Sequence, residues 1–489
     1  MATWKGLVHQ PSFNASTMLL LTDGRIMVQE DGTNHWHALS PDEKGSYRHG
    51  KWHKLASMLF YRRYFASGIL KDGRVIICGG EDSNGGGDTN KCEIYNPITD
   101  SWTVIPSPEN WTNVGDASSC VLPDGRFMIG NINDTECAIY DPVVNKWEKT
   151  GSKEVRSNEE TWILMPDNTI LTLQCFDPYN SEKYNIATGQ WRNEGPLALQ
   201  ETVEDNNGIM HESIVDQAMS EIGPAMLMPN RKVIYFGANG LSGVGKTAIY
   251  TPPGSPDGYG IWEMGPDIPN EAGKVLISND CPATLLPSGK VLFTTGLFSD
   301  NTGVPEANWI WPTGVYCFEY DPHTNSINPI ASPPNTNAGS YLFQSRMLLL
   351  PNGEVMYSNT GTDIQLYDGG GIPDNAWRPE IISITPVHIG HFIDYFELKG
   401  IRLNGLSQAN IYGDDCANAT NYPLVMLKAN NGDESYCRTF NFSTMGVATG
   451  SNVESCNFTV PPNHYGHYEL YVIANGIKSP LHHLYIPAL

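Results

Sequence analysis

A single turn motif recurs seven times in the first three quarters of the chain, and it constrains the fold more than any other feature. Each copy joins one apolar segment to another, as in Cys120–Gly130, where a Pro-Asp-Gly turn separates two apolar stretches. Asp-Gly and Asn-Gly pairs supply the positive φ that a tight β-hairpin requires. The turns are Thr22-Asp23-Gly24, Lys71-Asp72-Gly73, Pro123-Asp124-Gly125, Pro166-Asp167-Asn168, Pro229-Asn230-Arg231, Pro287-Ser288-Gly289 and Pro351-Asn352-Gly353. Their spacing of 43 to 64 residues is a propeller-blade length, so we expect seven blades.

An aromatic signature follows several of these hairpins. A tyrosine and a tryptophan recur at one fixed spacing in three copies, and looser versions begin at Tyr250 and Tyr320. The three copies are Tyr95 to Trp102, Tyr140 to Trp147 and Tyr184 to Trp191. The pattern predicts the two outer strands of each blade, and we interpret its aromatic rings as packing between blades. The segment at Trp4 resembles the one at Trp102, so we expect the N-terminal strand to close the last blade.

The repeats stop after Pro379, and about 110 residues of alternating apolar and polar positions follow. A chain of 489 residues with 48 glycines, 34 prolines and 17% charged residues is typical of many short strands and tight turns. We therefore predict an all-β protein. Residues 1–378 are expected to form a seven-bladed Kelch-type β-propeller, and residues 379–489 an immunoglobulin-like β-sandwich.

The charge balance excludes some partners. The formal net charge of −23 disfavours nucleic acid and anionic membrane surfaces, and no apolar run reaches the ~20 residues that a membrane helix needs. We expect a monomer that binds a small-molecule or carbohydrate-like substrate. The first residues lack the apolar core of a signal peptide.

Two further features bear on the compartment. Cys416, Cys437 and Cys456 are the best disulfide candidates, because they crowd into a short polar stretch. Six glycosylation sequons also occur in this acidic chain, and they favour a secreted glycoprotein over a cytosolic protein. The sequons are at Asn14, Asn110, Asn133, Asn418, Asn441 and Asn457.

The seven Kelch blades followed by a sandwich resemble the galactose oxidase and glyoxal oxidase family over nearly the whole chain. In that family a copper ion lies at the propeller axis. Its ligands are a cysteine-linked tyrosine, a Tyr-His pair from the last blade, and a histidine from the C-terminal domain. The resemblance places the linked tyrosine at Tyr64, within Arg62–Ser67 and just before the Asp72-Gly73 turn.

The other expected copper ligands are missing from the matching positions. The segment Pro11–Met18 has no cysteine to link to Tyr64, and Phe343-Gln344 stands where the Tyr-His pair belongs. The C-terminal histidine should lie in a loop that we match to Arg438–Gly446, which has none. Because Cu(II) prefers imidazole nitrogen, we expect no copper here. An oxidase with a rearranged copper site is kept as one alternative.

The start of each innermost strand should line the propeller axis, and the turn register identifies these residues. Counting back from each turn places an acid there in four of the seven blades, with Tyr64 in another. The predicted catalytic residues are Tyr64, Asp116, Glu159, Glu221 and Asp280. The predicted substrate-binding residues are Arg63, Asn14, Asn158, Asn279, Gln344, Phe343 and His211, the last from an acidic insertion over Gln200–Ser220 that we regard as a candidate lid.

Four converging carboxylates repel one another, so the axis must bind a cation or keep some acids protonated. Ca²⁺ would suit oxygen ligands of this kind. Protonated and ionised carboxyls would instead provide a general acid and a general base, with Tyr64 or Arg63 stabilising negative charge on the substrate. Alternatively, these acids cap backbone amides or lie in open water. We thus favour a copper-independent lyase, isomerase, cyclase or hydrolase acting on a small oxygenated substrate, with a non-catalytic carbohydrate- or peptide-binding propeller as the second hypothesis.

Overall fold

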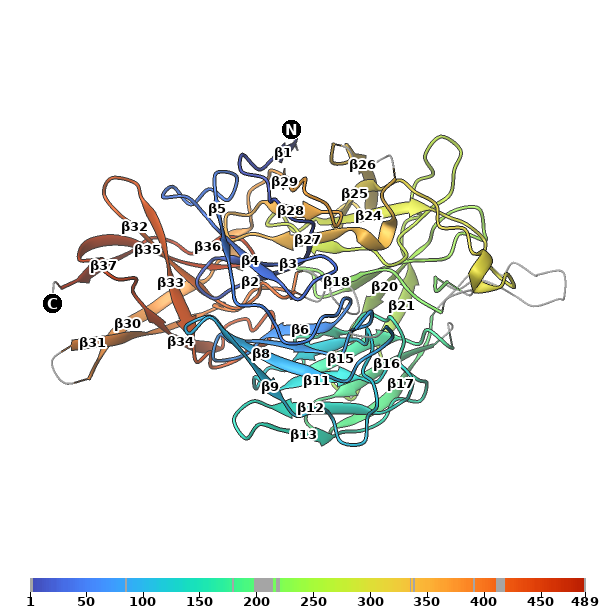
Figure 1. The fold of residues 1–489 in the computed structure, drawn as a ribbon, viewed down its shortest axis with the longest axis horizontal. Coiled ribbons are helices and arrows are strands. Elements are labelled where there is room, and N and C mark those ends of the chain that lie inside the picture. Colours follow the sequence, from blue (N-terminus) through green and yellow to red (C-terminus); the bar gives the residue numbers. More distant parts are fainter. Residues whose placement is uncertain are drawn as a thin grey trace.

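The computed structural model describes residues 3–83, 86–177, 180–197, 214–216, 220–334, 336, 339–389, 392–409 and 418–487. Their strands form seven sheets arranged as propeller blades and one larger C-terminal sheet (Figure 1). The predicted all-β class and seven-bladed Kelch-type propeller are confirmed. Within the described ranges, no helix has the length and apolar character needed to cross a membrane.

The first five blades are antiparallel meanders of four strands in chain order. Blade one contains β2 (Ala15–Leu20), β3 (Ile26–Glu30), β4 (Trp36–Ser40) and β5 (Lys51–Lys54). Blade two contains β6 (Ala66–Ile69), β7 (Val75–Cys78), β8 (Cys92–Asn96) and β9 (Ser101–Ile105). Blade three contains β10 (Ser119–Val121), β11 (Phe127–Gly130), β12 (Cys137–Asp141) and β13 (Lys146–Lys149). Blade four contains β14 (Ile163–Leu164), β15 (Thr169–Leu173), β16 (Asn180–Asn185) and β17 (Gln190–Pro196), and blade five contains β18 (Ala225–Leu227), β19 (Val233–Phe236), β20 (Thr247–Thr251) and β21 (Ile261–Met264).

The last two blades depart from this plan. In blade six, β22 (Leu276–Ile277) and β23 (Ala283–Leu285) both pair with β24 (Val291–Leu297), so the innermost strand is interrupted; β25 (Tyr316–Asp321) and β26 (Ser326–Ile330) follow. Blade seven contains β27 (Arg346–Leu349), β28 (Val355–Ser358), β29 (Gln365–Asp368) and β1 (Thr3–Gly6). Strand β1 pairs antiparallel with β29, so the N-terminal segment supplies the outermost strand of blade seven.

The recurring turns owe their shape to Asp-Gly-Arg chemistry. In the turn between β6 and β7, the Asp72 carboxylate accepts hydrogen bonds from the Arg74 backbone N–H at 3.0 Å and from Arg74 Nε at 2.7 Å. Gly73 has a φ of 87°, which a residue with a Cβ rarely adopts. The same two bonds recur in the turns at Asp23 and Asp124. The recurring sequence motif is therefore a hairpin turn in which the Asp side chain accepts hydrogen bonds from the Arg two residues later.

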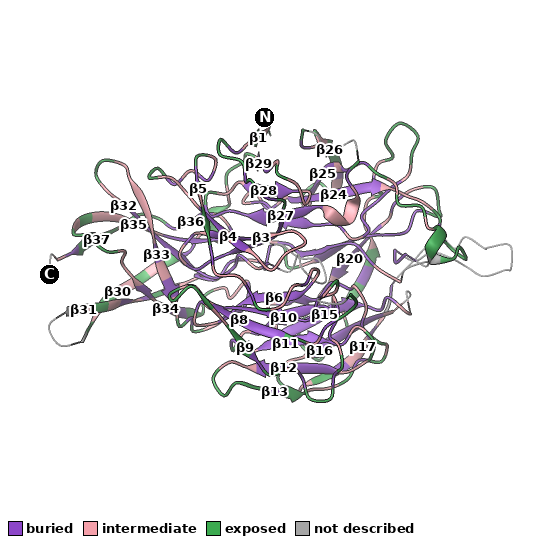
Figure 2. Ribbon diagram, in the orientation of Figure 1, coloured by how far each residue is buried: buried purple, intermediate pink, exposed green. Residues whose placement is uncertain are grey.

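The Tyr and Trp residues of the signature join neighbouring blades. Tyr95 is fully buried and its ring centroid lies 5.2 Å from that of Trp102, the next-strand partner in the same blade. The Trp102 indole N–H donates to the backbone carbonyl of Ala56, which follows blade one, at 2.9 Å. Trp147 of blade three likewise donates to Pro106 at 2.6 Å. Each aromatic pair thus ties its blade to the preceding one (Figure 2 shows the buried inner strands).

The C-terminal sheet follows the order β30-β31-β34-β33-β32-β35-β36, with β37 also pairing with β35, which is consistent with the predicted sandwich. Its strands are β30 (Glu380–Ile389), β31 (Phe392–Ile401), β32 (Leu424–Lys428), β33 (Glu434–Phe440), β34 (Val453–Thr459), β35 (Gly466–Ala474), β36 (Ile477–Lys478) and β37 (His482–Ile486). Of the three disulfide candidates, Cys437 and Cys456 are free thiols. Cys437 faces Val425 and Cys456 faces Leu398 across their strand pairs. Cys416 lies outside the described residues.

The C-terminal sheet docks on the turn side of the propeller. Backbone N–H groups of Thr439, Phe442 and Met445 donate to the turn carbonyls of Thr22, Lys71 and Pro123 at 3.0, 3.2 and 2.9 Å. These contacts place the red C-terminal strands against one side of the ring in Figure 1. The opposite side, where the innermost strands begin, is consequently left for a site.

The closure at β1 generates a stability prediction. The Trp4 ring lies 4.8 Å from that of Tyr367, and its indole N–H donates to the Ala331 carbonyl at 2.6 Å. Replacing Trp4 by Ala removes both contacts, so we expect the free energy of unfolding to fall by about 2 kcal/mol. Urea unfolding followed by circular dichroism measures this. Val143→Ala, at a side chain that is 90% exposed, is the control; equal stabilities of the Trp4 variant and the wild type would contradict the closing role of β1.

Candidate active site

A pocket of about 450 Å³ opens at the axis, on the side where the innermost strands begin. It contains all five residues predicted as catalytic, each from a different blade. Its lining consists of Tyr64, Glu81, Asp82, Asp116, Glu159, Glu221, Asp280, Trp309, Trp311, Tyr341 and Phe343. The predicted convergence on a central well is therefore present in the structure, while the catalytic role of these residues stays a prediction.

Backbone pairing places the residues of blades two and three side by side. Arg63 and Glu81 exchange two backbone hydrogen bonds, at 3.0 and 2.9 Å, and Gly80 N–H donates to Gly115 carbonyl at 2.7 Å. Gly80 has a φ of 95°, and a Cβ there would lie 2.4 Å from the Arg63 oxygen. Only glycine permits this close approach. Tyr64 follows Arg63 in the chain, and Asp116 follows Gly115. The pairing therefore places Glu81 between Tyr64 and Asp116.

Two asparagines link the blades on the other side of the pocket. Asn158 Nδ2 donates to the carbonyl of Ser220 at 2.6 Å, and Asn279 Nδ2 donates to Glu221 Oε2 at 3.2 Å. Asn158 directly precedes Glu159. These bonds connect blades four and six to the segment that begins blade five, and they hold Glu221 between its acidic neighbours.

Three residues of the pocket have strained backbones. Tyr64 has a φ of 46°, Asp82 a φ of 49° and Asp280 a φ of 54°, in the left-handed region that residues with a Cβ seldom occupy. Asp280 lies in the break between β22 and β23, where the innermost strand of blade six is interrupted. Such strain is typically kept at functional sites, where a side chain must be aimed at a ligand.

The acids raise one another's pKa values. Burial, together with the negative charges of Asp116 and Asp82, raises the pKa of Glu81 to about 7. Burial is also the largest cause for Asp116, whose pKa rises to about 7 although a hydrogen bond with Glu159 opposes the shift. Burial and the charge of Asp280 raise the pKa of Glu221 well above its usual range. At neutral pH the pocket therefore holds both carboxylic acids and carboxylates.

Three of these carboxyls are close enough to share one ligand. Oxygen atoms of Glu159, Glu221 and Asp280 all lie within 4.8 Å of one another. Oxygen atoms at this separation suit a hard cation such as Ca²⁺, and equally a proton shared between acids. The geometry permits both outcomes that the sequence left open.

Four aromatic rings in mutual contact also line the pocket. Trp311 packs edge-on against Phe343 at 5.6 Å, and Phe343 stacks on Tyr341 at 5.4 Å; Trp309 lies 5.9 Å from Trp311. The two tryptophans belong to the long connection between β24 and β25, and the other two rings precede β27. The pocket thus combines carboxyl groups with a set of aromatic rings, which we call the aromatic wall.

Sequence analysis missed five residues of this lining. Glu81 and Asp82 follow β7, the second strand of blade two, whereas the register count considered only the first strand of each blade. Trp309, Trp311 and Tyr341 lie in connections that the turn motif does not index. The Gly79-Gly80 pair before Glu81 was the available signal, because paired glycines mark a close backbone approach.

Most of the residues predicted to bind substrate lie outside the described lining of the axial pocket. Phe343 lines the axial pocket. Arg63 does not, because it pairs with Asp31 at 3.2 Å and Asp82 at 3.3 Å. Asn14 is exposed outside the lining, and Gln344 Oε1 instead accepts a hydrogen bond from the Tyr341 backbone N–H at 3.2 Å.

The remaining substrate-binding predictions concern two asparagines and the insertion. Asn158 lies behind the lining as an inter-blade link, and Asn279 lines a neighbouring pocket. His211 lies outside the described residues, as do 198–213 and 217–219 of the proposed lid. Five of the residues predicted to bind substrate do not line the axial pocket, and their binding role stays a prediction: Arg63, Asn14, Asn158, Asn279 and Gln344.

A copper ion does not fit the groups at this axis. The described lining offers carboxyl and phenol oxygens, and no histidine in the described part of the chain contributes to it. The loop Arg438–Gly446, expected to reach the axis, instead lies on the blade turns. Residues 405–409 and 418–422 contact the innermost strands, since Leu285 N–H donates to Ala409 at 2.9 Å and Asn418 Nδ2 donates to the Met18 carbonyl. No histidine occurs between 401 and 422, so the imidazoles that Cu(II) prefers are missing.

Comparisons with known proteins agree with the architecture. Residues 62–109 match the Kelch motif. Galactose oxidase from Gibberella zeae is 24% identical over 492 aligned residues, which cover 89% of this chain and 65% of that protein. The Kelch-like protein terF from Aspergillus terreus is 30% identical over 121 residues, covering 24% of this chain and 25% of the relative. The chain thus spans a quarter to just under two thirds of these relatives' lengths.

Solved structures extend the likeness in fold. A fungal alcohol oxidase of the AA5 family, solved in complex with copper, matches with a TM-score of 0.55 and 15% identity over all of both chains. At this identity the match concerns the fold alone. It covers the propeller and the C-terminal sheet together.

The raised acid pKa values generate a stability prediction. Folded Asp116 keeps its proton up to about pH 7, whereas an unfolded aspartate releases it near pH 4. The unfolded chain binds fewer protons between these values, so the free energy of unfolding should fall as pH rises from about 4 to about 7. Asp116→Asn should therefore be more stable than the wild type at about pH 8, by about 1–3 kcal/mol, and lose this advantage near pH 4.

Urea unfolding at about pH 4, at about pH 8 and at one pH between them measures the difference in free energy of unfolding between Asp116→Asn and the wild type. Glu148→Gln is the matched control, because its side chain is 67% exposed on an outer strand, and it should show no pH-dependent difference. An Asp116→Asn variant less stable than the wild type at every pH would show that the carboxylate is stabilising, and would contradict the raised pKa.

Proposed function

We propose that this chain, a galactose oxidase-like Kelch propeller, is a copper-independent enzyme that transfers protons to and from a small oxygenated substrate at its axis. One observation carries the proposal: carboxyl groups with raised pKa values, about 7 for Glu81 and Asp116, line the same pocket as a tyrosine. Enzymes that use carboxyl groups in acid–base catalysis at neutral pH raise their pKa values in this way. Lyase, isomerase, cyclase and hydrolase reactions can all proceed with such an acid–base pair.

The different environments assign the two roles. Glu221, whose pKa is raised well above its usual range by burial and by the charge of Asp280, serves as the general acid. Asp116, with a pKa of about 7, is ionised in roughly half of the molecules at neutral pH and serves as the general base. Asp116 takes a proton from the substrate, while Glu221 gives its proton to the oxygen that gains charge. One proton enters as another leaves, so no oxidant or reductant is consumed.

The neighbouring residues support these two carboxyls. A side-chain hydrogen bond with Glu159 orients Asp116. The charge of Asp280 raises the pKa values of both Asp116 and Glu221. Tyr64, held by its strained backbone at the rim, serves as a hydrogen-bond donor to a developing oxyanion. The aromatic wall excludes water from the opposite side and strengthens these interactions.

A non-catalytic binding protein is the second candidate, and the aromatic wall favours it. Flat rings such as Trp311 and Phe343 suit the apolar faces of carbohydrates or of peptide side chains. It differs from the first candidate in one measurable way, because a binding protein would retain ligand without converting it.

We also propose an extracellular location. Four of the sequon asparagines are exposed, which leaves them accessible for glycosylation: Asn14, Asn110, Asn133 and Asn441. Asn418 is only 3% exposed and donates to the Met18 carbonyl, so the folded chain does not present it. Galactose oxidase-like relatives provide the remaining support.

The catalytic proposal predicts that single changes abolish turnover. A panel of hydroxy acids, keto acids, lactones and sugars in D₂O, followed by proton NMR, detects exchange, elimination, isomerisation and hydrolysis together. On any converted compound, Asp116→Asn, Glu221→Gln and Tyr64→Phe should each lower kcat by about 10²-fold or more. Glu148→Gln should retain wild-type kcat. Full activity in all three pocket variants, with circular dichroism showing folded protein, would refute the assignment.

The oxygen-only donor set predicts weak copper binding. After incubation with Cu(II) and passage over a chelating resin, mass spectrometry of the metal content should find less than about 0.1 equivalent of copper per chain. Retention of one tight equivalent, with nitrogen couplings in its electron paramagnetic resonance spectrum, would establish a rearranged copper site instead.

A further inference from the structure

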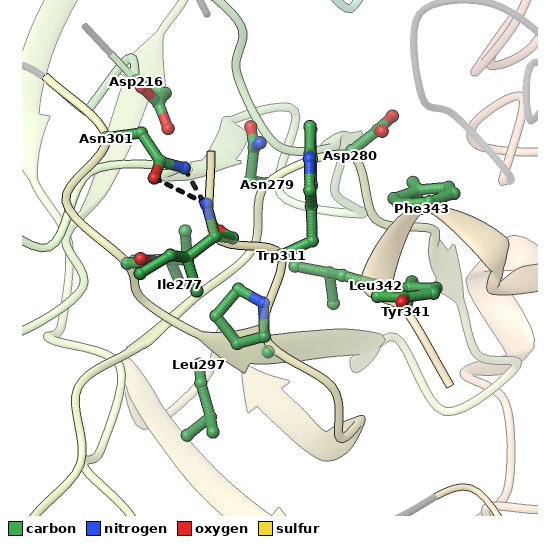
Figure 3. Close-up of a pocket in the computed structure, with 14 residues that line it drawn as sticks. Asp216, Ile277, Asn279, Asp280, Leu297, Asn301, Trp311, Tyr341, Leu342 and Phe343 are labelled. Carbon is green, nitrogen blue, oxygen red and sulfur yellow. Dashed lines mark hydrogen bonds between the residues drawn. The ribbon is translucent and has the colours of Figure 1, made fainter. Parts of the chain in front are cut away.

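A second, smaller pocket of about 40 Å³ adjoins the axial one and shares part of its wall (Figure 3). The shared residues are Asp280, Trp311, Tyr341 and Phe343. In Figure 3, Trp311 lies between Asn279 on one side and Phe343 on the other. The volume holds roughly three water molecules or a group of a few heavy atoms. A ligand at the axis can therefore extend one small substituent past Trp311.

The side pocket is apolar on one face and rich in acceptors on the other. Ile277, Leu297 and Leu342 belong to the apolar face, whereas Asp216, Asn279 and Asp280 supply oxygens. Asn279 is only 4% exposed, and its Oδ1 has no hydrogen-bond partner among the described residues. Leaving such a buried acceptor unsatisfied costs about 1–3 kcal/mol. A ligand that brings N–H or O–H donors would remove this cost.

The axial pocket is also rich in hydrogen-bond acceptors and lacks basic side chains among its described lining residues. Six of its lining residues are acids, and no lysine, arginine or histidine lines it among the described residues. Two arginines lie beside the pocket, and neither belongs to its lining. Arg63 pairs with Asp31 and with the lining residue Asp82, and Arg346, 5.6 Å from the Tyr64 ring, donates to the carbonyls of Phe343 and Ser345. A positively charged ligand in the pocket would be attracted by the carboxylates there.

The aromatic wall selects among positive ligands. A hard metal ion is satisfied by oxygen ligands, whereas an organic cation is also attracted by the π-electrons of Trp, Tyr and Phe. Trp309, Trp311, Tyr341 and Phe343 form a chain of ring contacts in the pocket that the acids also line. Carboxylates and rings in one pocket form a complementary site for an ammonium group that carries carbon substituents.

We infer that the substrate is a small hydroxylated organic cation, whose ammonium group binds between the axial acids and the aromatic wall and whose small substituent enters the side pocket beside Asn279. This inference rests on the proposed function, and it specifies the substrate class. It explains why an acidic chain gathers further acids at its centre.

Isothermal titration calorimetry with two matched pairs of probes tests the inference. Choline is compared with its neutral isostere 3,3-dimethylbutan-1-ol, and glucosamine with glucose. At about pH 7, where the amine of glucosamine is still largely protonated, at least one cation should bind at least tenfold more tightly than its neutral counterpart. Asp280→Asn and Trp311→Ala should each weaken that binding about tenfold, while Trp311→Phe, which keeps a ring, should retain most of it. Glu148→Gln should bind as the wild type does.

Three outcomes would overturn the inference. The first is no measurable binding of either cation, and the second is equal binding of the charged and neutral members of both pairs. The third is Ca²⁺ that binds stoichiometrically to the wild type and displaces the cation, because the carboxyls would then serve a metal.

The two proposals fail in different ways. Turnover of a neutral compound that depends on Asp116, without selective cation binding, rejects the substrate class alone. Selective cation binding with no conversion of choline, glucosamine or any compound of the NMR panel rejects catalysis alone and identifies a binding protein.

Discussion

The ring geometry of the propeller is the constraint on which the rest of the structure depends. Every innermost strand begins near the same axis, so residues from separate blades meet there although they are far apart in the chain. Four such positions carry Asp or Glu, and the connection after β7 adds two more acids. Burial prevents water from screening their charges, and proximity makes each carboxylate disfavour its neighbours. The near-neutral pKa values therefore follow from the fold as much as from the individual side chains.

Much of this arrangement could be predicted from the sequence, because periodic features index a propeller. The Asp-Gly turns fix where each blade begins, and a constant count back from them found Tyr64, Asp116, Glu159 and Asp280. The same count failed where the chain departs from the repeat. Trp309 and Trp311 lie in an irregular connection, and Glu81 depends on a glycine-mediated approach between blades that no periodicity encodes.

Residue type alone did not predict how several neighbours of the axial pocket are held. Asn158 and Asn279 precede pocket acids, and both donate amide hydrogens to the adjoining blade, although Asn279 also lines the side pocket. Arg63 lies outside the axial lining and pairs with Asp31 and Asp82. Whether a polar side chain turns towards the axis or towards the next blade depends on the backbone angle at its position, and the sequence does not specify that angle.

The closure of blade seven has a consequence for how the chain folds. Thr3 pairs with Asp368, and Gly6 with Gln365, so the two edges that complete the ring are separated by nearly the whole propeller. During synthesis the first strand leaves the ribosome long before its partner and must remain unpaired until then. Contacts of such high sequence separation form late and slowly. The short, half-exposed β1, with a lysine and a glycine among its four residues, presents little apolar edge to aggregation while it waits.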